Sequence, residues 1–206
     1  MKLSRLHFPV TTLGPGRRVG IWFQGCSIRC PGCISIDTWA TNTPKIAVAQ
    51  VLDLVLSWPA DGVTVSGGEP FDQPEALFEF LSGLREHRPD CDVLAYSGYP
   101  VERLETSPCL ALIDALISDP FQAEQSQSLA LRGSDNQRLH FLSERGRQRF
   151  QTFERLRNTS DDTLDLVSDA DGTIWLAGIP QRGALESLKN LLQTQGTVIA
   201  TTEGKL

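Results

Sequence analysis

Three cysteines within eight residues are the first side chains that indicate chemistry. Cys26, Cys30 and Cys33 follow the pattern C-x3-C-x2-C and supply soft thiolates suited to iron–sulfur or zinc. A closed structural metal site normally needs four ligands. No further Cys or His lies near the triplet in the sequence: His7 comes before the first predicted strand, and His87 lies at the end of a later predicted helix. We therefore expect an open metal position where an iron binds a substrate or cofactor. A zinc site completed by a distant residue is the alternative.

A second segment, Ser66-Gly67-Gly68-Glu69-Pro70, has the composition of a ligand-binding loop. Paired glycines let the backbone approach a small ligand closely. A glutamate beside them can accept hydrogen bonds from an ammonium group. By itself this is an ordinary strand-to-helix turn, and its meaning depends on what lies next to it.

The predicted elements bring these segments together. Short β-rich runs at 19–23, 63–66, 92–96 and 115–118 alternate with amphipathic stretches, which predicts βα units and a parallel sheet. The cysteines follow the first strand, the glycine pair follows the second, and Ser97-Gly98 follows the third. Because ligands bind beyond the carboxyl ends of parallel strands, we expect the three loops to form one site.

Helix signals accompany this pattern. Thr43-Pro44 predicts a capped helix start, and Asp72 with Glu75 has capping-box spacing. The second helix should bury a stripe consisting of Leu77, Phe80, Leu81 and Leu84.

The character of the chain changes near residue 143. We expect one core domain at 1–142 and a C-terminal extension of unknown role at 143–206. The extension is predicted to contain an arginine-rich helical stretch at 143–157, a β-hairpin around an Asp-Gly turn at 164–177, a helix at 181–195 and a strand at 197–201.

Composition limits the classes of protein. A net charge of −6, from 19 basic and 25 acidic residues, disfavours a nucleic-acid binder. No apolar run approaches the roughly 20 residues of a membrane span, and the first residues lack the apolar core of a signal peptide. We expect a cytoplasmic protein, in which clustered cysteines indicate metal ligation or catalysis rather than disulfides. The distant Cys91 and Cys109 are expected to be small buried hydrophobes.

The order of the motifs resembles a known family. FQGCSIRCPGC (residues 23–33), preceded by Gly14-Pro15-Gly16-Arg17 and followed by Thr38-Trp39 and VSGGEP (residues 65–70), is similar to the glycyl-radical-enzyme activases of the radical S-adenosylmethionine (SAM) superfamily. The activating proteins of anaerobic ribonucleotide reductase are the closer match. Ser97-Gly98-Tyr99, Asp119-Pro120-Phe121 and an RGSxNQ-like run at 132–137 extend the resemblance to about residues 7–142.

The resemblance implies an α/β fold, an open partial (β/α) TIM-like barrel of parallel strands with a small C-terminal α/β extension. It implies that the three cysteines ligate three irons of a [4Fe-4S] cluster, while the amino and carboxylate groups of SAM bind the fourth. Gly67, Gly68 and Glu69 would line the methionine end of SAM, Gly32 and Ile34 its adenine, and Ser97 the ribose or the methionine end.

The implied activity is that of an anaerobic radical SAM oxidoreductase. One electron, from a flavodoxin- or ferredoxin-type donor, cleaves SAM into methionine and a 5′-deoxyadenosyl radical, which abstracts a hydrogen from a glycine of a partner enzyme. Two departures stand out: Ile34 and Ser35 occupy positions where such activases usually have an aromatic residue and asparagine, and the chain continues for more than sixty residues after the RGSxNQ-like run.

Two alternatives remain open at this point. A radical SAM enzyme can act on a small molecule or peptide, as the deazaguanine-forming enzymes do. A non-catalytic iron–sulfur or zinc protein would use the cysteines for structure or electron transfer, but it leaves SGGEP and the RGSxNQ-like run unexplained.

Overall fold

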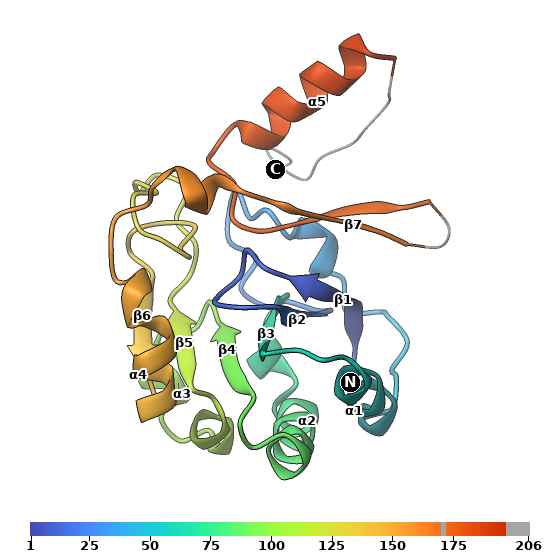
Figure 1. Ribbon diagram of the computed structural model, residues 1–206, viewed down its shortest axis with the longest axis vertical. Coiled ribbons are helices and arrows are strands. Elements are labelled where there is room, and N and C mark those ends of the chain that lie inside the picture. Colours follow the sequence, from blue (N-terminus) through green and yellow to red (C-terminus); the bar gives the residue numbers. More distant parts are fainter. Residues whose placement is uncertain (170–171, 197–206) are drawn as a thin grey trace.

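A computed structural model describes residues 1–169 and 172–196. They form an α/β fold around a six-stranded sheet with the strand order β1-β2-β3-β4-β5-β6 (Figure 1). The strands are β1 (Leu3–Val10), β2 (Arg18–Phe23), β3 (Gly62–Gly67), β4 (Asp92–Tyr96), β5 (Ala115–Ser118) and β6 (Arg138–Phe141). The four central strands are parallel and correspond to the four predicted ones.

Both edge strands depart from the predicted all-parallel arrangement. Strand β1, which the sequence pattern did not predict, pairs antiparallel with β2, and β6 pairs antiparallel with β5. The connection 11–17 is too short for a parallel crossover, which needs about a dozen residues or more. The described strands do not close into a barrel, since β1 and β6 are opposite edges of the sheet.

Helices pack on the sheet to form the main core. α1 (Val48–Ser57), α2 (Pro74–His87) and the short α3 (Val101–Leu104) follow strands β2, β3 and β4 (Figure 1). The predicted buried stripe of α2 is confirmed in full. Its β-branched and aliphatic partners on β2, β3 and β4 are almost wholly removed from water. The other face of these strands is also buried, but it includes the polar side chains of Arg18, Thr64 and Asp92.

Both predicted helix caps are wrong. Helix α1 begins at Val48 with Ala47 as its cap, several residues after Thr43. Helix α2 is preceded by Gln73, and Asp72 lies in a 3-10 turn before it. The Asp72 carboxylate instead accepts the backbone N–H of Ser27 at 2.8 Å, so a contact with the cysteine loop replaces the local cap.

Residues 143–206, predicted to form a C-terminal extension, include α4 (Glu144–Phe150), β7 (Asp165–Ser168), β8 (Ile174–Ala177) and α5 (Ala184–Thr194). The predicted hairpin and last helix are confirmed, whereas the predicted helix at 143–157 is regular only over α4. The strand predicted at 197–201 lies outside the described residues. In Figure 1 the hairpin crosses one end of the sheet, with α5 beyond it.

The two isolated cysteines and the absence of a membrane span were also expected from the sequence. Cys91 and Cys109 are buried, as predicted for small apolar side chains. We find no helix in the described ranges with the length and apolarity that crossing a bilayer requires.

Candidate functional site

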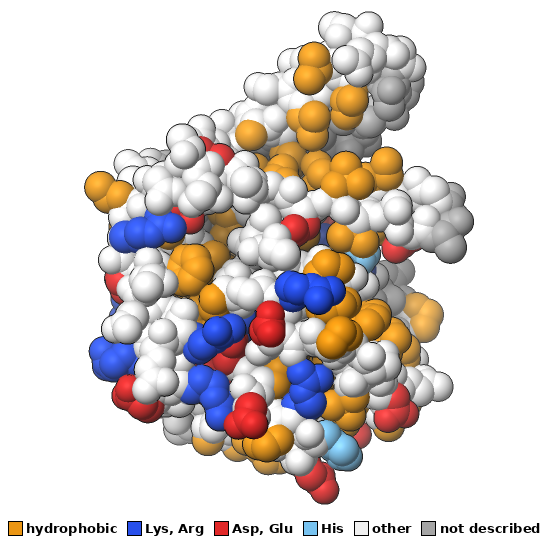
Figure 2. Space-filling model, in the orientation of Figure 1, with side chains coloured by type: hydrophobic (Ala, Val, Ile, Leu, Met, Phe, Trp, Pro, Cys, Tyr) orange, Lys and Arg blue, Asp and Glu red, His pale blue; other side chains and the backbone are white. Residues whose placement is uncertain are grey.

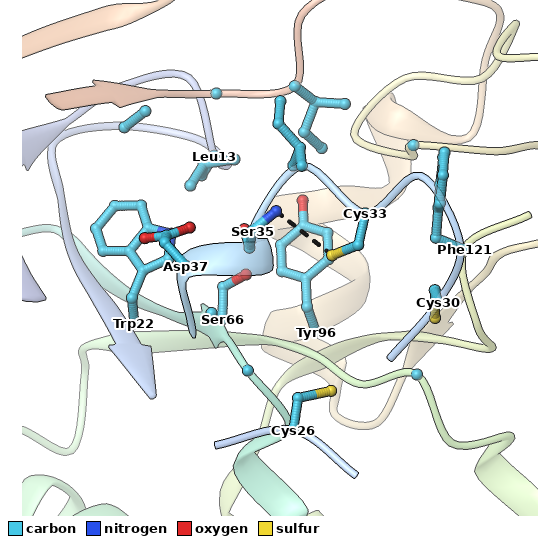
Figure 3. A pocket seen from close by; sticks show the side chains of 18 of the residues that line it. Leu13, Trp22, Cys26, Cys30, Cys33, Ser35, Asp37, Ser66, Tyr96 and Phe121 are labelled. Atoms are coloured by element: carbon cyan, nitrogen blue, oxygen red, sulfur yellow. Dashed lines mark hydrogen bonds between the residues drawn. The ribbon is translucent and has the colours of Figure 1, made fainter. Parts of the chain in front are cut away.

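One pocket at the carboxyl ends of β2, β3 and β4 contains all of the predicted site residues. These are Cys26, Cys30, Gly32, Cys33, Ile34, Gly67, Gly68, Glu69 and Ser97. The pocket has a volume of about 440 Å³, within the usual range of small-ligand sites. Figure 3 shows the three cysteines around a common space, with Cys30 beside Phe121 and Cys33 beside Ser35.

The cysteine loop is closed by hydrogen bonds between its beginning and its end. The N–H of Gly25 donates to the carbonyl of Thr38 at 2.7 Å, and that of Cys26 donates to Trp39 at 3.4 Å. The buried Thr38 hydroxyl in turn donates to the carbonyl of Ser35 at 2.6 Å. These bonds explain why Thr38-Trp39 accompanies the cysteine motif. The two residues hold the end of the loop against its beginning and thereby fix the positions of the thiols.

The three thiols are surrounded by N–H donors. Burial is the largest effect and raises the pKa of each thiol. Donors that act against this rise are the backbone N–H groups of Ile28 and Arg29 at Cys26, of Phe121 at Cys30 and of Ser35 at Cys33, with the Trp39 side chain also at Cys33. Such donors stabilise thiolates, and hydrogen bonds to sulfur help to set the potential of an iron–sulfur cluster. The described residues contain no group of three Cys, His, Asp or Glu side chains placed to hold one metal ion.

Glu69 joins the loop after β3 to the loop after β4. Its buried carboxylate accepts the N–H of Phe71 at 3.0 Å, the hydroxyl of Ser97 at 2.9 Å and the N–H of Gly98 at 2.8 Å. Burial outweighs these bonds and raises the pKa of Glu69 to about 7. A carboxylate has about four acceptor positions, of which the described residues occupy three. Glu69 can therefore accept one more donor, such as an ammonium group, from the pocket.

The glycine pair lets the β3 loop lie directly on the start of the cysteine loop. A Cβ on Gly68 would lie 2.2 Å from the carbonyl oxygen of Gly25, and one on Gly67, at φ +97°, would lie 2.6 Å from the nitrogen of Phe23. The N–H of Gly68 donates to Phe23 at 2.8 Å, and that of Glu69 donates to Gly25 at 2.9 Å. No side chain fits at either glycine, so the two loops act as one rigid wall of the pocket.

The RGSxNQ-like run braces the loop after β5. The Gln137 side chain accepts the N–H of Gly133 at 2.9 Å and donates to Asp119 at 3.2 Å, while Asn136 donates to Pro120 at 2.8 Å. These bonds hold Phe121, whose ring would contact a Cβ added at Gly133. The motif therefore acts by positioning Phe121 beside Cys30.

Sequence reasoning missed two parts of the pocket. Tyr96 lines it and donates to the carbonyl of Leu131 at 3.0 Å; its place at the carboxyl end of β4, next to Ser97, is the signal that identifies it. The second part is contributed by the C-terminal extension, including Trp175 and Ile179. No spacing in the sequence relates those residues to the cysteines.

Comparison with known proteins now decides the family. Residues 12–140 match the family described as a 4Fe-4S single cluster domain. The anaerobic ribonucleoside-triphosphate reductase-activating protein of Escherichia coli K12 is 30% identical over 149 residues, which cover 66% of this chain and 96% of that protein. The chain belongs to the 4Fe-4S single cluster domain family. Within it, the chain is a radical SAM enzyme of the glycyl-radical-activase type.

Further relatives agree with this assignment. The activating protein of the same name from Enterobacteria phage T4 is 27% identical over 132 residues, covering 61% of this chain and 85% of the relative. The pyruvate formate-lyase-activating enzyme of Listeria monocytogenes is 43% identical over 91 residues, covering 39% and 36% of the two chains.

The cofactors of this activase are a [4Fe-4S] cluster and SAM. The residues in the pocket fit both groups. Three free thiols beside N–H donors suit a thiolate-ligated cluster. A side-chain-free glycine pair next to a carboxylate with a remaining acceptor position suits the ammonium end of an amino acid.

Proposed function

We propose that this protein installs a glycyl radical on a partner enzyme such as an anaerobic ribonucleotide reductase. The observation that carries the proposal is that one pocket contains the cysteine triplet, the glycine pair and Glu69. The similarity to proteins named for activating ribonucleoside-triphosphate reductases supports this choice of partner.

Each group of residues has a distinct role in this proposal. Cys26, Cys30 and Cys33 hold the cluster. Gly67, Gly68 and Glu69 bind the methionine end of SAM, Gly32 and Ile34 lie along its adenine, and Ser97 reaches the ribose or the methionine end. When bound, the reduced cluster with SAM supplies a 5′-deoxyadenosyl radical and methionine.

The chain contributes orientation and exclusion of water. Ser97 donates to Glu69 at 2.9 Å, so the residue proposed to contact SAM also fixes the carboxylate that meets the SAM ammonium. Leu13, Trp22 and Phe121 give the rest of the pocket an apolar lining. Removing water from such a site protects a reactive radical from side reactions.

The finer organisation is part of the same proposal. The open six-stranded sheet serves as the partial barrel of this enzyme class, residues 1–142 form the radical SAM core, and residues 143–206 form the extension. The electron donor is a flavodoxin or ferredoxin, and the protein acts in the cytoplasm. The parallel central strands and the position of the pocket at their carboxyl ends support this organisation.

The test uses full-length protein reconstituted without oxygen and reduced with dithionite. With SAM and the anaerobic reductase of the same organism, we expect 5′-deoxyadenosine and a glycyl radical detected by electron paramagnetic resonance. Cys30→Ala should lose both products and iron, whereas the matched control Cys109→Ala, at a buried cysteine outside the pocket, should keep all three.

The outcomes separate the candidate functions. A glycyl radical on the reductase that depends on Cys30 supports the proposal. Product formation that accelerates with a small metabolite, and not with the protein partner, would instead favour the small-molecule reaction. Failure of the Cys30→Ala variant to lose iron would contradict the assignment of the cluster ligands.

A further inference from the structure

The C-terminal extension contributes one wall of the radical-forming pocket. The extension residues that line it include the large apolar side chains of Leu164, Ile174, Trp175, Leu176, Ile179 and Leu185. They all lie beyond residue 140, where the family match ends, and the E. coli relative, aligned over 96% of its own length, covers 66% of this chain. This wall is therefore a feature that the family assignment does not explain.

The base of the hairpin is anchored by one carboxylate. Asp165 accepts four hydrogen bonds from consecutive threonines: from the N–H and hydroxyl of Thr11 at 2.6 and 2.7 Å, and from those of Thr12 at 3.0 and 2.9 Å. The Thr12 hydroxyl also lies 3.0 Å from the carbonyl of Ala177. Bonds to a charged acceptor are the stronger kind, so β7 and β8 are both tied to the end of β1.

The segment after the hairpin is tied to the other side of the pocket. Arg157 donates to the carbonyl of Ile179 at 2.8 Å, and Gln127 donates to that of Pro180 at 2.9 Å. Arg182 donates to the carbonyl of Ala123 at 2.6 Å. The extension is therefore attached on both sides of the pocket, at Asp165 before the hairpin and at Pro180 and Arg182 after it.

An aromatic and cationic stack joins the wall to the sheet. The Arg5 guanidinium lies 5.3 Å from the ring centre of Trp22 on β2 and 4.6 Å from that of Trp175 on β8, and it pairs with Asp37. All four side chains line the pocket. Cation–π contacts of this kind contribute about 0.5–2 kcal/mol, the upper end when desolvated. Trp175 is therefore both a lining residue and the link that sets the distance between hairpin and sheet.

The face of the hairpin opposite to Trp175 is apolar and exposed to solvent. Ile174 and Leu176 are 60% and 38% exposed although both border the pocket. In Figure 2, hydrophobic side chains gather over the hairpin and along α5. Trp175 points to the other face of the same strand, so a partner segment that passes the edge of the hairpin meets Ile174 and Leu176 on one face and Trp175 on the other.

We propose that hairpin β7–β8 is a specificity wall that admits the acceptor glycine on an extended partner segment with apolar neighbours. This inference rests on the proposed function, since it concerns the protein substrate of that reaction. Hydrogen abstraction needs the reacting atoms about 3–3.5 Å apart, so the glycine must enter the pocket and its flanking residues must pass the wall. Trp175 and Ile174 contact those flanking residues and determine which partner is accepted.

The test measures binding and activation separately. The probe is a dye-labelled synthetic peptide spanning the radical-site glycine of the reductase from the same organism, titrated by fluorescence anisotropy against the reconstituted full-length protein. For Trp175→Ala and for Ile174→Ala we expect a rise of about tenfold in the Kd of the peptide, equivalent to about 1.4 kcal/mol. The KM for the intact reductase should rise in parallel, with a smaller change in kcat.

Two matched variants serve as controls. Leu166→Ala removes an equally apolar, 67% exposed side chain that pairs with Leu176 on the same hairpin but lies outside the pocket, and it should leave Kd and KM within twofold. Trp175→Phe keeps an aromatic face over Arg5 and should restore most of the affinity. A fold defect in Trp175→Ala would appear in circular dichroism, and Ile174→Ala then carries the test.

The outcomes distinguish the wall from the proposed function. If wild type generates a glycyl radical but both pocket variants bind and activate as wild type does, or if the peptide fails to bind wild type, the wall is overturned while the activity stands. If wild type generates no radical on the reductase, the proposed function itself fails. A selective rise of Kd and KM in the two pocket variants establishes the wall.

Discussion

Replacing Glu69 by glutamine removes the charge beside the glycine pair while keeping the size of the side chain. The carboxylate now accepts three hydrogen bonds, from Phe71, Ser97 and Gly98. An amide has one acceptor oxygen and one donor nitrogen, so one of these donors must face another donor. Leaving a buried donor unpaired costs about 1–3 kcal/mol, which the free energy of unfolding should show.

The magnitude for SAM binding follows from the pKa of about 7. If only ionised Glu69 binds the SAM ammonium, apparent affinity scales with the ionised fraction. That fraction falls about tenfold between pH 8 and pH 6 for this pKa. In wild type, the Kd for SAM should therefore rise about tenfold on acidification. In Glu69→Gln it should be flat across this range, and at pH 8 about tenfold to hundredfold weaker, as expected for a lost bond to a charged group.

The raised pKa of Glu69 also makes the free energy of unfolding depend on pH when SAM is absent. Because the folded pKa of Glu69 exceeds the ordinary value of 4.5, the folded state holds more protons between pH 4.5 and 7. The contribution of this group to the free energy of unfolding is therefore fully present below pH 4.5. It is lost as the pH rises through 7, by about 3 kcal/mol at most. Glu69→Gln should remove this decrease.

The assay is equilibrium dialysis of SAM against anaerobically reconstituted protein at pH 6, 7 and 8. Glu75→Gln is the matched control, because Glu75 is an exposed carboxylate of the same segment at the start of α2. It should retain the wild-type slope. A wild-type Kd that does not change with pH, or an equal slope in Glu69→Gln, would refute the role given to the Glu69 charge.

Two further substitutions test the rigidity of the scaffold. Gly68→Ala places a Cβ 2.2 Å from the backbone carbonyl of Gly25 and should lower the free energy of unfolding by about 2–3 kcal/mol, measured by urea denaturation. Gly98→Ala, which meets only the end of a flexible side chain, should have a smaller effect, and equal losses would contradict the steric argument. Arg18→Met breaks a buried ion pair with Asp92 of 2.6 Å but leaves Asp92 paired with Arg149 at 2.9 Å. It should lower the free energy of unfolding by at most about 3–5 kcal/mol, again by urea denaturation. A loss below 1 kcal/mol would show that Arg149 alone satisfies Asp92.

Local patterns in the sequence were sufficient for the central strands and for identifying residues that line the pocket. Strand β4 and strand β5 begin and end at the predicted residues, because short apolar runs bounded by polar turns have few other ways to be buried. The caps failed for the opposite reason. Asp72 had the spacing of a helix cap, but its carboxylate bonds to Ser27 from another loop, and a local rule contains no information about that partner.

The cysteine triplet and the glycine pair were identifiable from sequence because their chemistry depends on residue types at short spacing. That they meet in one pocket could also be expected, since parallel strands bring their carboxyl ends to one edge. What the sequence by itself determined was therefore the family, the cofactors and the loops proposed to hold them.

The tertiary structure alone decided how the pocket is closed. Arg5, Trp22 and Trp175 stack although they are separated by up to 170 positions in the chain, and Asp165 bonds to Thr11 and Thr12 across a similar separation. Such contacts depend on where the extension folds back, which is set by the sum of many weak interactions over a surface rather than by any motif. The identity of the wall facing the cysteines is for this reason a property of the folded chain.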